Sequence, residues 1–214
     1  GYEVFSYGES FVTPRIFAEA LTFLALTAWL NGRPIAAWCL VLAAGLLHPL
    51  MAMAGAALFA CMIAIRYWRV RAAWIALGLA TAGVLMLLML HPDLKARVFL
   101  VYDPAWFEAV QLRNPYVFVD QWNATAFGRL IWAGVVLTLA AREENALLRR
   151  LAFAMVLTAA SLLLLSWLGA SVWKNVLLTQ VQLWRSFWLA QVLVLVMLGA
   201  MLPRLWQSDY ADRI

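Results

Sequence analysis

Two arginines that stand beside other polar groups, within otherwise apolar sequence, are the residues of this chain best suited to chemistry. Arg15 and Glu19 lie four residues apart in TPRIFAEALTF, so on a helix they share one face. Ionisable residues in such a setting usually face a protein interior or a watery cavity, where this pair could bind a charged head group. An ion pair, or an arginine that snorkels at a helix start, is an equally good alternative.

The second arginine lies in VQLWRSFWLAQ, where Gln182, Arg185 and Ser186 fall at i, i+3 and i+4 of a helix. The planar, permanently charged guanidinium of Arg185 suits a phosphate or a carboxylate, and glutamine amides suit sugar hydroxyls. Trp184 and Trp188 occupy a neighbouring face, and tryptophan with a snorkelling arginine is also a common anchor for a helix end. Because the glutamine and the arginine come together, we favour a binding role.

Each of the two histidines precedes a proline. His48, in LLHPLMAMAG, could act as a general base or donate to a phosphate, because the ordinary pKa of histidine lies near neutrality; a hydrogen-bonded structural role is the alternative. His91 and Asp93 could hold a divalent cation with Glu9 or Asp120, but their spacing matches no fixed metal motif. A divalent cation is therefore a candidate cofactor, without assigned metal ligands.

The composition determines which elements position these groups. Of the 214 residues, 66% are hydrophobic and only 13% are charged. A soluble chain could not cover so much apolar surface with so little charge, whereas helices in lipid satisfy every backbone polar group internally. We therefore predict an all-α fold, a polytopic transmembrane helix bundle that forms a single domain over residues 1–214. The net charge of +5 reflects arginine clusters between apolar segments and does not indicate nucleic-acid binding.

Apolar runs between charge clusters and prolines define about seven membrane segments: residues 14–30, 35–47, 49–65, 72–90, 125–141, 151–168 and 186–202. One helix over residues 35–65 would be far longer than a hydrocarbon core of about 30 Å. Pro49 removes a backbone donor and disfavours helix at the residue before it. A short helix hairpin hinged at His48-Pro49 is therefore predicted, in preference to a kinked single helix.

The distribution of positive charge predicts the orientation. With seven segments, one side of the membrane receives nine Lys and Arg against four acids, and the other receives seven of each. The richer side includes the short clusters RYWRVR and REENALLRR, which are typical of cytoplasmic connections. We therefore expect the N-terminus outside and the C-terminus in the cytoplasm, so that both histidines lie at extracytoplasmic helix ends.

The longest connection, residues 91–124, is extracytoplasmic in this topology. Within it, DPAWFEAVQL predicts a short helix with Asp103 as N-cap and Pro104 at the first helical position. Its aromatic content suits the bilayer interface, either as a lid over a cavity or as a passive surface helix.

The run TPRIFAEALTFLALTAWLNGRPIAAWCLVLAAGLLHPLMAMAGAALF joins an arginine-led helix, a basic turn, a short helix rich in small residues and an LLHP hinge. This succession resembles bacterial membrane proteins of the GT-C glycosyltransferase superfamily and their uncharacterised relatives. The segment VQLWRSFWLAQ resembles a Q-x-x-R segment of the same relatives. The resemblance covers residues 9–65 and 178–200, and the middle of the chain only by its hydropathy.

The resemblance implies an inverting glycosyltransferase of the bacterial inner membrane, which uses a polyprenyl-phosphate-linked sugar at the extracytoplasmic face. Membrane lipid and such a sugar donor are then the expected partners. In that family the catalytic acid follows a first helix that this chain, which opens at Gly1, does not show, so we expect further helices upstream. The catalytic candidates are Glu9, Glu19 and His48, and the substrate-binding candidates are Arg15, Arg113, Gln182 and Arg185.

Two other functions fit the same residues. A transporter or flippase subunit would use the charged outer end as one end of a path, and would need polar groups through the midplane. The sequence offers mainly hydroxyls there, at Thr138, Thr158, Ser161 and Ser166, which are ordinary helix-packing groups. A non-catalytic membrane assembly protein would use the outer polar residues only to anchor its helices.

Overall fold

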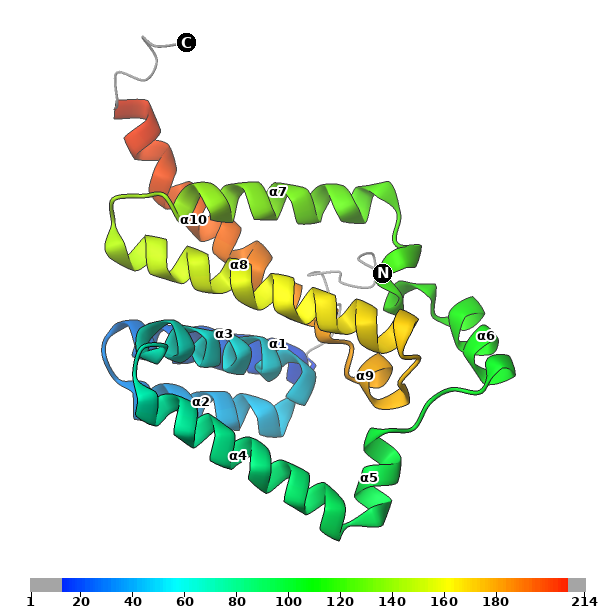
Figure 1. Ribbon diagram of the computed structural model, residues 1–214. Coiled ribbons are helices and arrows are strands. Elements are labelled where there is room, and N and C mark those ends of the chain that lie inside the picture. The colour runs from blue at the N-terminus through cyan, green and yellow to red at the C-terminus, as the bar shows by residue number, and fades with distance from the viewer. Residues whose placement is uncertain (1–12, 208–214) are drawn as a thin grey trace.

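Each apolar segment of the sequence forms a helix in the computed structural model of the chain, which describes residues 13–207, with the backbone alone from residue 203 onward. The long helices lie roughly side by side, with their connections at two opposite ends (Figure 1). They are α1 (Pro14–Leu30), α2 (Pro34–Leu47), α3 (Pro49–Tyr67), α4 (Arg71–Leu90), α7 (Ala124–Ala140), α8 (Ala146–Trp167) and α10 (Phe187–Gln207). These bounds agree with the predicted segments to within a few residues, except that α8 starts earlier than predicted and α10 ends later.

The prediction of about seven membrane segments is not supported. Within residues 13–207, four helices are long and apolar enough to cross a membrane: Pro49–Tyr67, Arg71–Leu90, Ala146–Val172 and Val176–Leu202. The reason is length, because α2 has 14 residues and α1 and α7 have 17 each. At about 1.5 Å per residue these three helices reach only about 21–26 Å, short of a hydrocarbon core of about 30 Å.

The hinge at His48-Pro49 is confirmed. His48 has an extended backbone, with φ −154° and ψ 93°, and separates two antiparallel helices rather than continuing one. Its N–H donates to the carbonyl of Ala44 at 2.8 Å, and its own carbonyl accepts from the N–H of Ala52 at 3.2 Å. One residue thus closes α2 and opens α3, which are the roles that a residue before proline can fill.

Helices α1, α2 and α3 pack tightly because small residues line their contacts. Ala18 and Ala25 of α1, Ala37 of α2 and Ala54 of α3 are all fully buried. Helices α1 and α3 lie very close together at Gly55, where an added Cβ would be only 2.7 Å from Cγ2 of Thr22. Small residues let helix backbones approach closely where lipid supplies no hydrophobic drive between helices.

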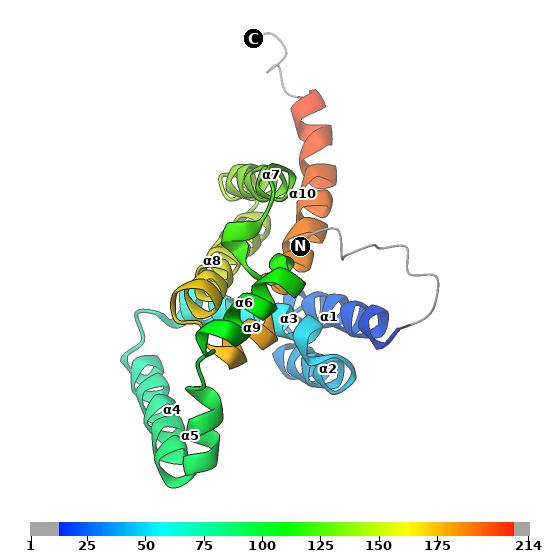
Figure 2. The ribbon, with the colours of Figure 1, turned by 90° about the vertical axis from the view of Figure 1, so that its right-hand side faces the viewer.

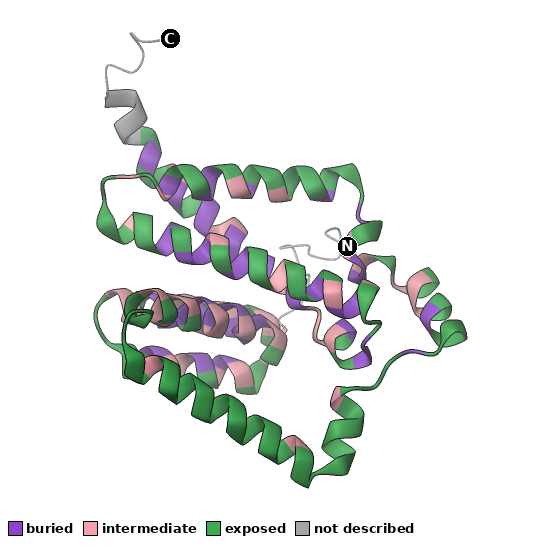
Figure 3. Cartoon of the chain, viewed as in Figure 1, coloured by how far each residue is buried: buried purple, intermediate pink, exposed green. Residues whose placement is uncertain are grey.

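Helices α7, α8 and α10 form the second part of the bundle and pack against the first part through α3. Their shared core is built of Leu137, Met155, Leu193 and Met197, each 3% exposed or less. Buried residues gather on the facing sides of these helices (Figure 3).

Helix α4 differs from the others because it contains no buried residue, although its membrane-length window is the most apolar, level with that of α8. It lies apart from the bundle together with α5 (Figure 2) and is exposed along nearly its whole length (Figure 3). A helix that is apolar all round and uncovered by its own chain has the surface of a lipid-facing helix.

The long connection folds into a small unit at one end of the bundle, which we name the cap. It comprises α5 (Pro92–Val98), α6 (Pro104–Arg113), η2 (Pro115–Val117), η3 (Val119–Gln121) and, from further along the chain, η4 (Leu168–Val172) and α9 (Val176–Val181). The predicted helix is α6: the Asp103 carboxylate accepts from the N–H of Trp106 at 3.0 Å, and Pro104 is the first helical residue. The cap has a hydrophobic cluster of its own, formed by Tyr102, Phe107, Val117, Phe118, Ala170 and Val176.

Backbone pairing ties the two halves of the cap together. The N–H of Tyr102 donates to the carbonyl of Lys174 at 3.0 Å, and the N–H of Val176 donates to that of Leu100 at 2.9 Å. Asn175, between them, donates from Nδ2 to the carbonyl of Val98 at 2.8 Å. Residues 98–102 are therefore strapped to the start of α9.

Candidate functional site

The polar run around Arg185 does not form the regular helix that its spacing predicted. Helix α9 ends at Val181, Gln182 adopts the left-handed conformation with φ 47°, and Leu183–Ser186 form the 3₁₀ segment η5. A 3₁₀ turn brings residues three apart into register, so Oε1 of Gln182 accepts a hydrogen bond from Nε of Arg185. The prediction of a helical face was wrong here, but the glutamine and the arginine do meet.

An aromatic cluster surrounds Trp184, the residue before Arg185. The guanidinium carbon of Arg185 lies 5.4 Å from the ring centroid of Trp184, which is 1% exposed. Trp122 and Tyr116, at the edge of the cap, meet the Trp184 ring edge-on, with centroids 5.6 and 6.4 Å away. The cap therefore fixes the ring on which Arg185 rests, and the Gln182 amide fixes the direction of its guanidinium.

The pair on α1 lies beside this arginine. Nε of Arg15 is 3.8 Å from Oε1 of Glu19, and their side chains are 16% and 18% exposed. The ring of Phe23, further along α1, packs edge-on against Trp188, three residues after Arg185, with the centroids 5.4 Å apart. Helix α1 therefore lies beside the segment that carries Arg185, and the charge of Arg15 acts on Arg185 across this contact. We name Arg15, Glu19, Gln182 and Arg185 the two-arginine site.

The other predicted site residues are placed less centrally. His48 is half-buried at the hinge, at the start of α3, which packs against η5. Arg113 is exposed in the last turn of α6 and is not joined to the two-arginine site by the contacts described. Glu9 lies outside the described residues. His91 is exposed between α4 and α5, and Asp93 is exposed in the first turn of α5. No group of three or more His, Cys, Asp or Glu in residues 13–207 could hold a metal ion.

Two features of this end of the molecule were not predicted from the sequence. The hydroxyl of Ser171 donates to a carboxylate oxygen of Asp120, which links η4 to η3. Asn175 caps α9 by accepting from the N–H of Leu178 at 2.9 Å. An asparagine before the apolar run VLL is a sequence signal for a helix start, so the cap residue could have been found. Ser171 and Asp120 are 51 residues apart, and no local pattern relates them.

Tyr102 is the buried titratable group of the cap. Burial in the aromatic cluster raises the pKa of Tyr102, and a side-chain hydrogen bond with Thr179 acts in the opposite direction. Its ring packs edge-on against Trp106, with the centroids 4.6 Å apart. Burial thus disfavours the charged phenolate, and the neutral Tyr102 ring is part of the hydrophobic cluster of the cap.

Comparison of the chain with protein-family models, with curated proteins and with solved structures finds no match. The chemistry of the two-arginine site is therefore the basis for inferring function. Two arginines on adjoining segments, each with a polar partner, offer N–H donors in the planar arrangement that suits a phosphate or a carboxylate.

Proposed function

We propose that this chain belongs to an integral membrane glycosyltransferase that resembles the GT-C superfamily and transfers a sugar from a polyprenyl-phosphate donor. In this proposal the cap end faces the outside of the bacterial inner membrane and the basic turns face the cytoplasm. The observation that carries the proposal is that α1, with the pair Arg15 and Glu19, packs beside the segment in which Gln182 holds Arg185.

A phosphate diester is the ligand that suits two arginines at the edge of an apolar bundle. Each guanidinium can offer two parallel N–H donors to phosphate oxygens. The hydrogen bond from Nε of Arg185 to Gln182 orients one of these forks before any ligand arrives. The polyprenyl chain would remain in the surrounding lipid, which matches a site built into an apolar bundle.

For these candidate residues we propose the following chemistry. An acceptor hydroxyl attacks the anomeric carbon of the donor sugar and loses its proton to the Glu19 or Glu9 carboxylate. The bond between the anomeric carbon and the phosphate oxygen breaks, and polyprenyl phosphate leaves with the bonding electrons. Arg15 and Arg185 stabilise the negative charge that develops on this phosphate, while His48 and Gln182 contact the sugar.

The test is sugar transfer by the full-length protein in proteoliposomes, supplied with a series of radiolabelled hexosyl polyprenyl phosphates and a membrane extract as the source of acceptor. Arg185→Ala should lower the transfer rate by about 100-fold or more, the usual effect of removing one donor to a developing oxyanion. Arg185→Lys should retain part of the rate, because lysine keeps the charge and loses the fork. Arg97→Ala, in exposed α5, is the matched control and should transfer at the wild-type rate.

Full activity of Arg185→Ala would remove this arginine from the site. Failure of the wild-type protein to release polyprenyl phosphate from any donor in the series would overturn the glycosyltransferase proposal. Movement of labelled donor across the bilayer without its cleavage would instead identify a flippase.

A further inference from the structure

A charged cavity lies at the end of the bundle opposite the cap. It has a volume of about 650 Å³, within the range of about 300–1,000 Å³ typical of ligand sites. Its walls come from the ends of α1 and α3 and from the start of α8, and include Trp29, Met62 and Leu147. Its charged lining residues are Arg66 and Arg150, and no carboxylate lines it within the part of the chain that the structure describes.

An apolar groove adjoins this cavity. The groove has a volume of about 620 Å³ and runs between α3, α4 and α8, with Trp74, Leu77 and Phe153 among its lining residues. Ile65 lines both the cavity and the groove, so this side chain is a wall that the two spaces share. A charged compartment therefore lies beside a mainly apolar one.

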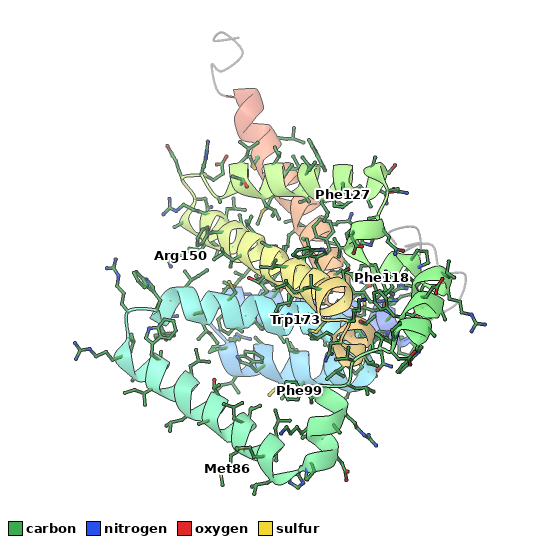
Figure 4. All side chains as sticks on the ribbon, turned by 45° about the vertical axis from the view of Figure 1, so that its right-hand side comes forward. Met86, Phe99, Phe118, Phe127, Arg150 and Trp173 are labelled. Carbon is green, nitrogen blue, oxygen red and sulfur yellow. The ribbon has the colours of Figure 1, made fainter. Side chains whose placement is uncertain are left out.

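One face of α8 runs through both compartments. Leu147 and Arg150 line the charged cavity, and Phe153 and Leu157 line the groove. Their spacing of three, three and four residues keeps all four side chains on one side of the helix. Figure 4 shows Arg150 at the end of the bundle away from Phe99 and Phe118 of the cap. The charge thus sits at the helix end and the apolar lining extends from it toward the middle of the bundle.

The surroundings of the cavity are strongly basic. The three turns at this end, α1–α2, α3–α4 and α7–α8 with the helix ends beside them (Figure 1), carry Arg33, Arg66, Arg69, Arg71, Arg142, Arg149 and Arg150 against Glu143 and Glu144. Such an excess of positive charge raises the local concentration of anions at the surface of a membrane.

We propose that an anionic phospholipid binds here, with its phosphate between Arg66 and Arg150 and one acyl chain in the groove between α3, α4 and α8. Charge complementarity selects the head group, because the described lining of the cavity offers two cations and no acid. The continuous apolar face of α8 selects a lipid over a free anion, because a free anion has no part that would fill the groove. This site is separate from the two-arginine site and does not depend on the proposed sugar transfer.

The experiment is native mass spectrometry of the purified full chain in non-ionic detergent, titrated with three probes: dioleoyl phosphatidylglycerol, dioleoyl phosphatidylcholine and inorganic phosphate. The wild-type protein should retain phosphatidylglycerol in preference to the other two. Arg66→Ala and Arg150→Ala should each weaken its binding about tenfold, the usual effect of losing one hydrogen bond to a charged group. Because the measurement counts lipid on folded protein, it remains informative for a less stable variant.

Arg71→Ala is the matched control, since it removes the same charge at the same end of the bundle from an exposed position outside both cavities. It should bind phosphatidylglycerol as the wild type does. An equal loss with Arg71→Ala would mean that overall charge, and not this cavity, attracts the lipid. Equal retention of phosphatidylcholine would reduce the site to an apolar groove, and equal affinity for inorganic phosphate would make it an anion site without a lipid; either result overturns the proposal.

Discussion

Gly55 shows how closely two helices can depend on one residue. Its backbone faces Thr22 across the α1–α3 contact, where a Cβ would meet Cγ2 of Thr22 at 2.7 Å. Thr22 cannot move aside without cost, because its hydroxyl donates to the carbonyl of Ala18 at 2.7 Å and the side chain is 1% exposed. Since α1 carries Arg15 and α3 packs against η5, this contact also helps to set the distance between the two arginines.

Gly55→Ala should destabilise the protein by about 1–3 kcal/mol, the usual cost of forcing an extra methyl group into a packed core. Thr22→Ser removes the opposing methyl group and keeps the hydroxyl, so the double variant should recover most of the loss. Thermal unfolding in detergent micelles measures both changes.

Gly78→Ala provides the comparison, because a Cβ at Gly78 meets no atom within 4 Å. It should leave the unfolding temperature unchanged or raise it, as alanine favours helix over glycine. If the double variant is as unstable as Gly55→Ala alone, the contact with Thr22 is not the cause.

At the level of elements, the cap depends less on its helices than on a short strap, which we define as residues 98–102 paired with residues 174–176. Its helices have 6 to 10 residues, too few to be stable alone in water. Asn175 connects them: it is 8% exposed, caps α9 through its side-chain oxygen and holds residues 98–102 through its side-chain nitrogen. The aromatic cluster around Trp184 then transmits the position of the cap to η5.

Asn175→Ala should release the strap, because it removes the donor to Val98 and the acceptor for Leu178 together. A lost N-cap and a lost hydrogen bond together predict a local destabilisation of about 1–3 kcal/mol. Hydrogen exchange should therefore accelerate at the amides of Tyr102 and Val176, whose partners lie in the strap. Asn175→Asp, which keeps the acceptor, should show a smaller increase.

Asn145→Ala is the matched control. Asn145 caps the start of α8, the end of that helix away from the cap, by accepting from the N–H groups of Leu147 and Leu148. It should accelerate exchange at the start of α8 and leave the Tyr102 amide protected. Unchanged exchange at Tyr102 in Asn175→Ala would show that backbone pairing alone holds the strap.

The two ends of the whole molecule differ in charge and in structure. The three arginine-rich turns occupy one end and the cap occupies the other (Figure 1). The basic turns thus lie together at one end, while the part of the chain that the structure describes has four helices of membrane length. The two proposed sites lie one at each end, so each can be tested without disturbing the other.

The proposed orientation predicts that the two ends react from opposite sides of the membrane. In a Cys39→Ala, Cys61→Ala background, Leu112→Cys on exposed α6 should react with a membrane-impermeant maleimide in intact spheroplasts. Glu144→Cys, in the α7–α8 turn, should react only after the membrane is permeabilised. The reverse pattern would overturn the proposed orientation, and labelling of both cysteines from one side would contradict the separation of the two ends.

Much of the helical layout could be predicted because its causes are local. Proline at residues 14, 34, 49 and 104 begins α1, α2, α3 and α6, since a residue without an N–H is tolerated in the first turn. The predicted number of membrane segments was too high because every apolar run was taken as a membrane span. Three of those runs form helices of only 14 or 17 residues. Length, and not hydropathy, separates α2 from α4.

The candidate site was predictable only in its parts. The pairs Arg15 with Glu19 and Gln182 with Arg185 are each visible in the sequence, because partners three or four residues apart meet on almost any helical turn. The break at Gln182 was missed, because a left-handed glutamine is uncommon and no neighbouring residue in the sequence signals it.

The amino-acid sequence by itself determined the helical class, the apolar surface, the hinge at His48 and the basic turns, since each follows from composition or from neighbours a few residues apart. Only the tertiary structure decided that Arg15 approaches Arg185 and that Arg66 and Arg150 share a cavity. These pairs join residues far apart in the chain, and their proximity depends on how small residues such as Ala18 and Gly55 let whole helices pack.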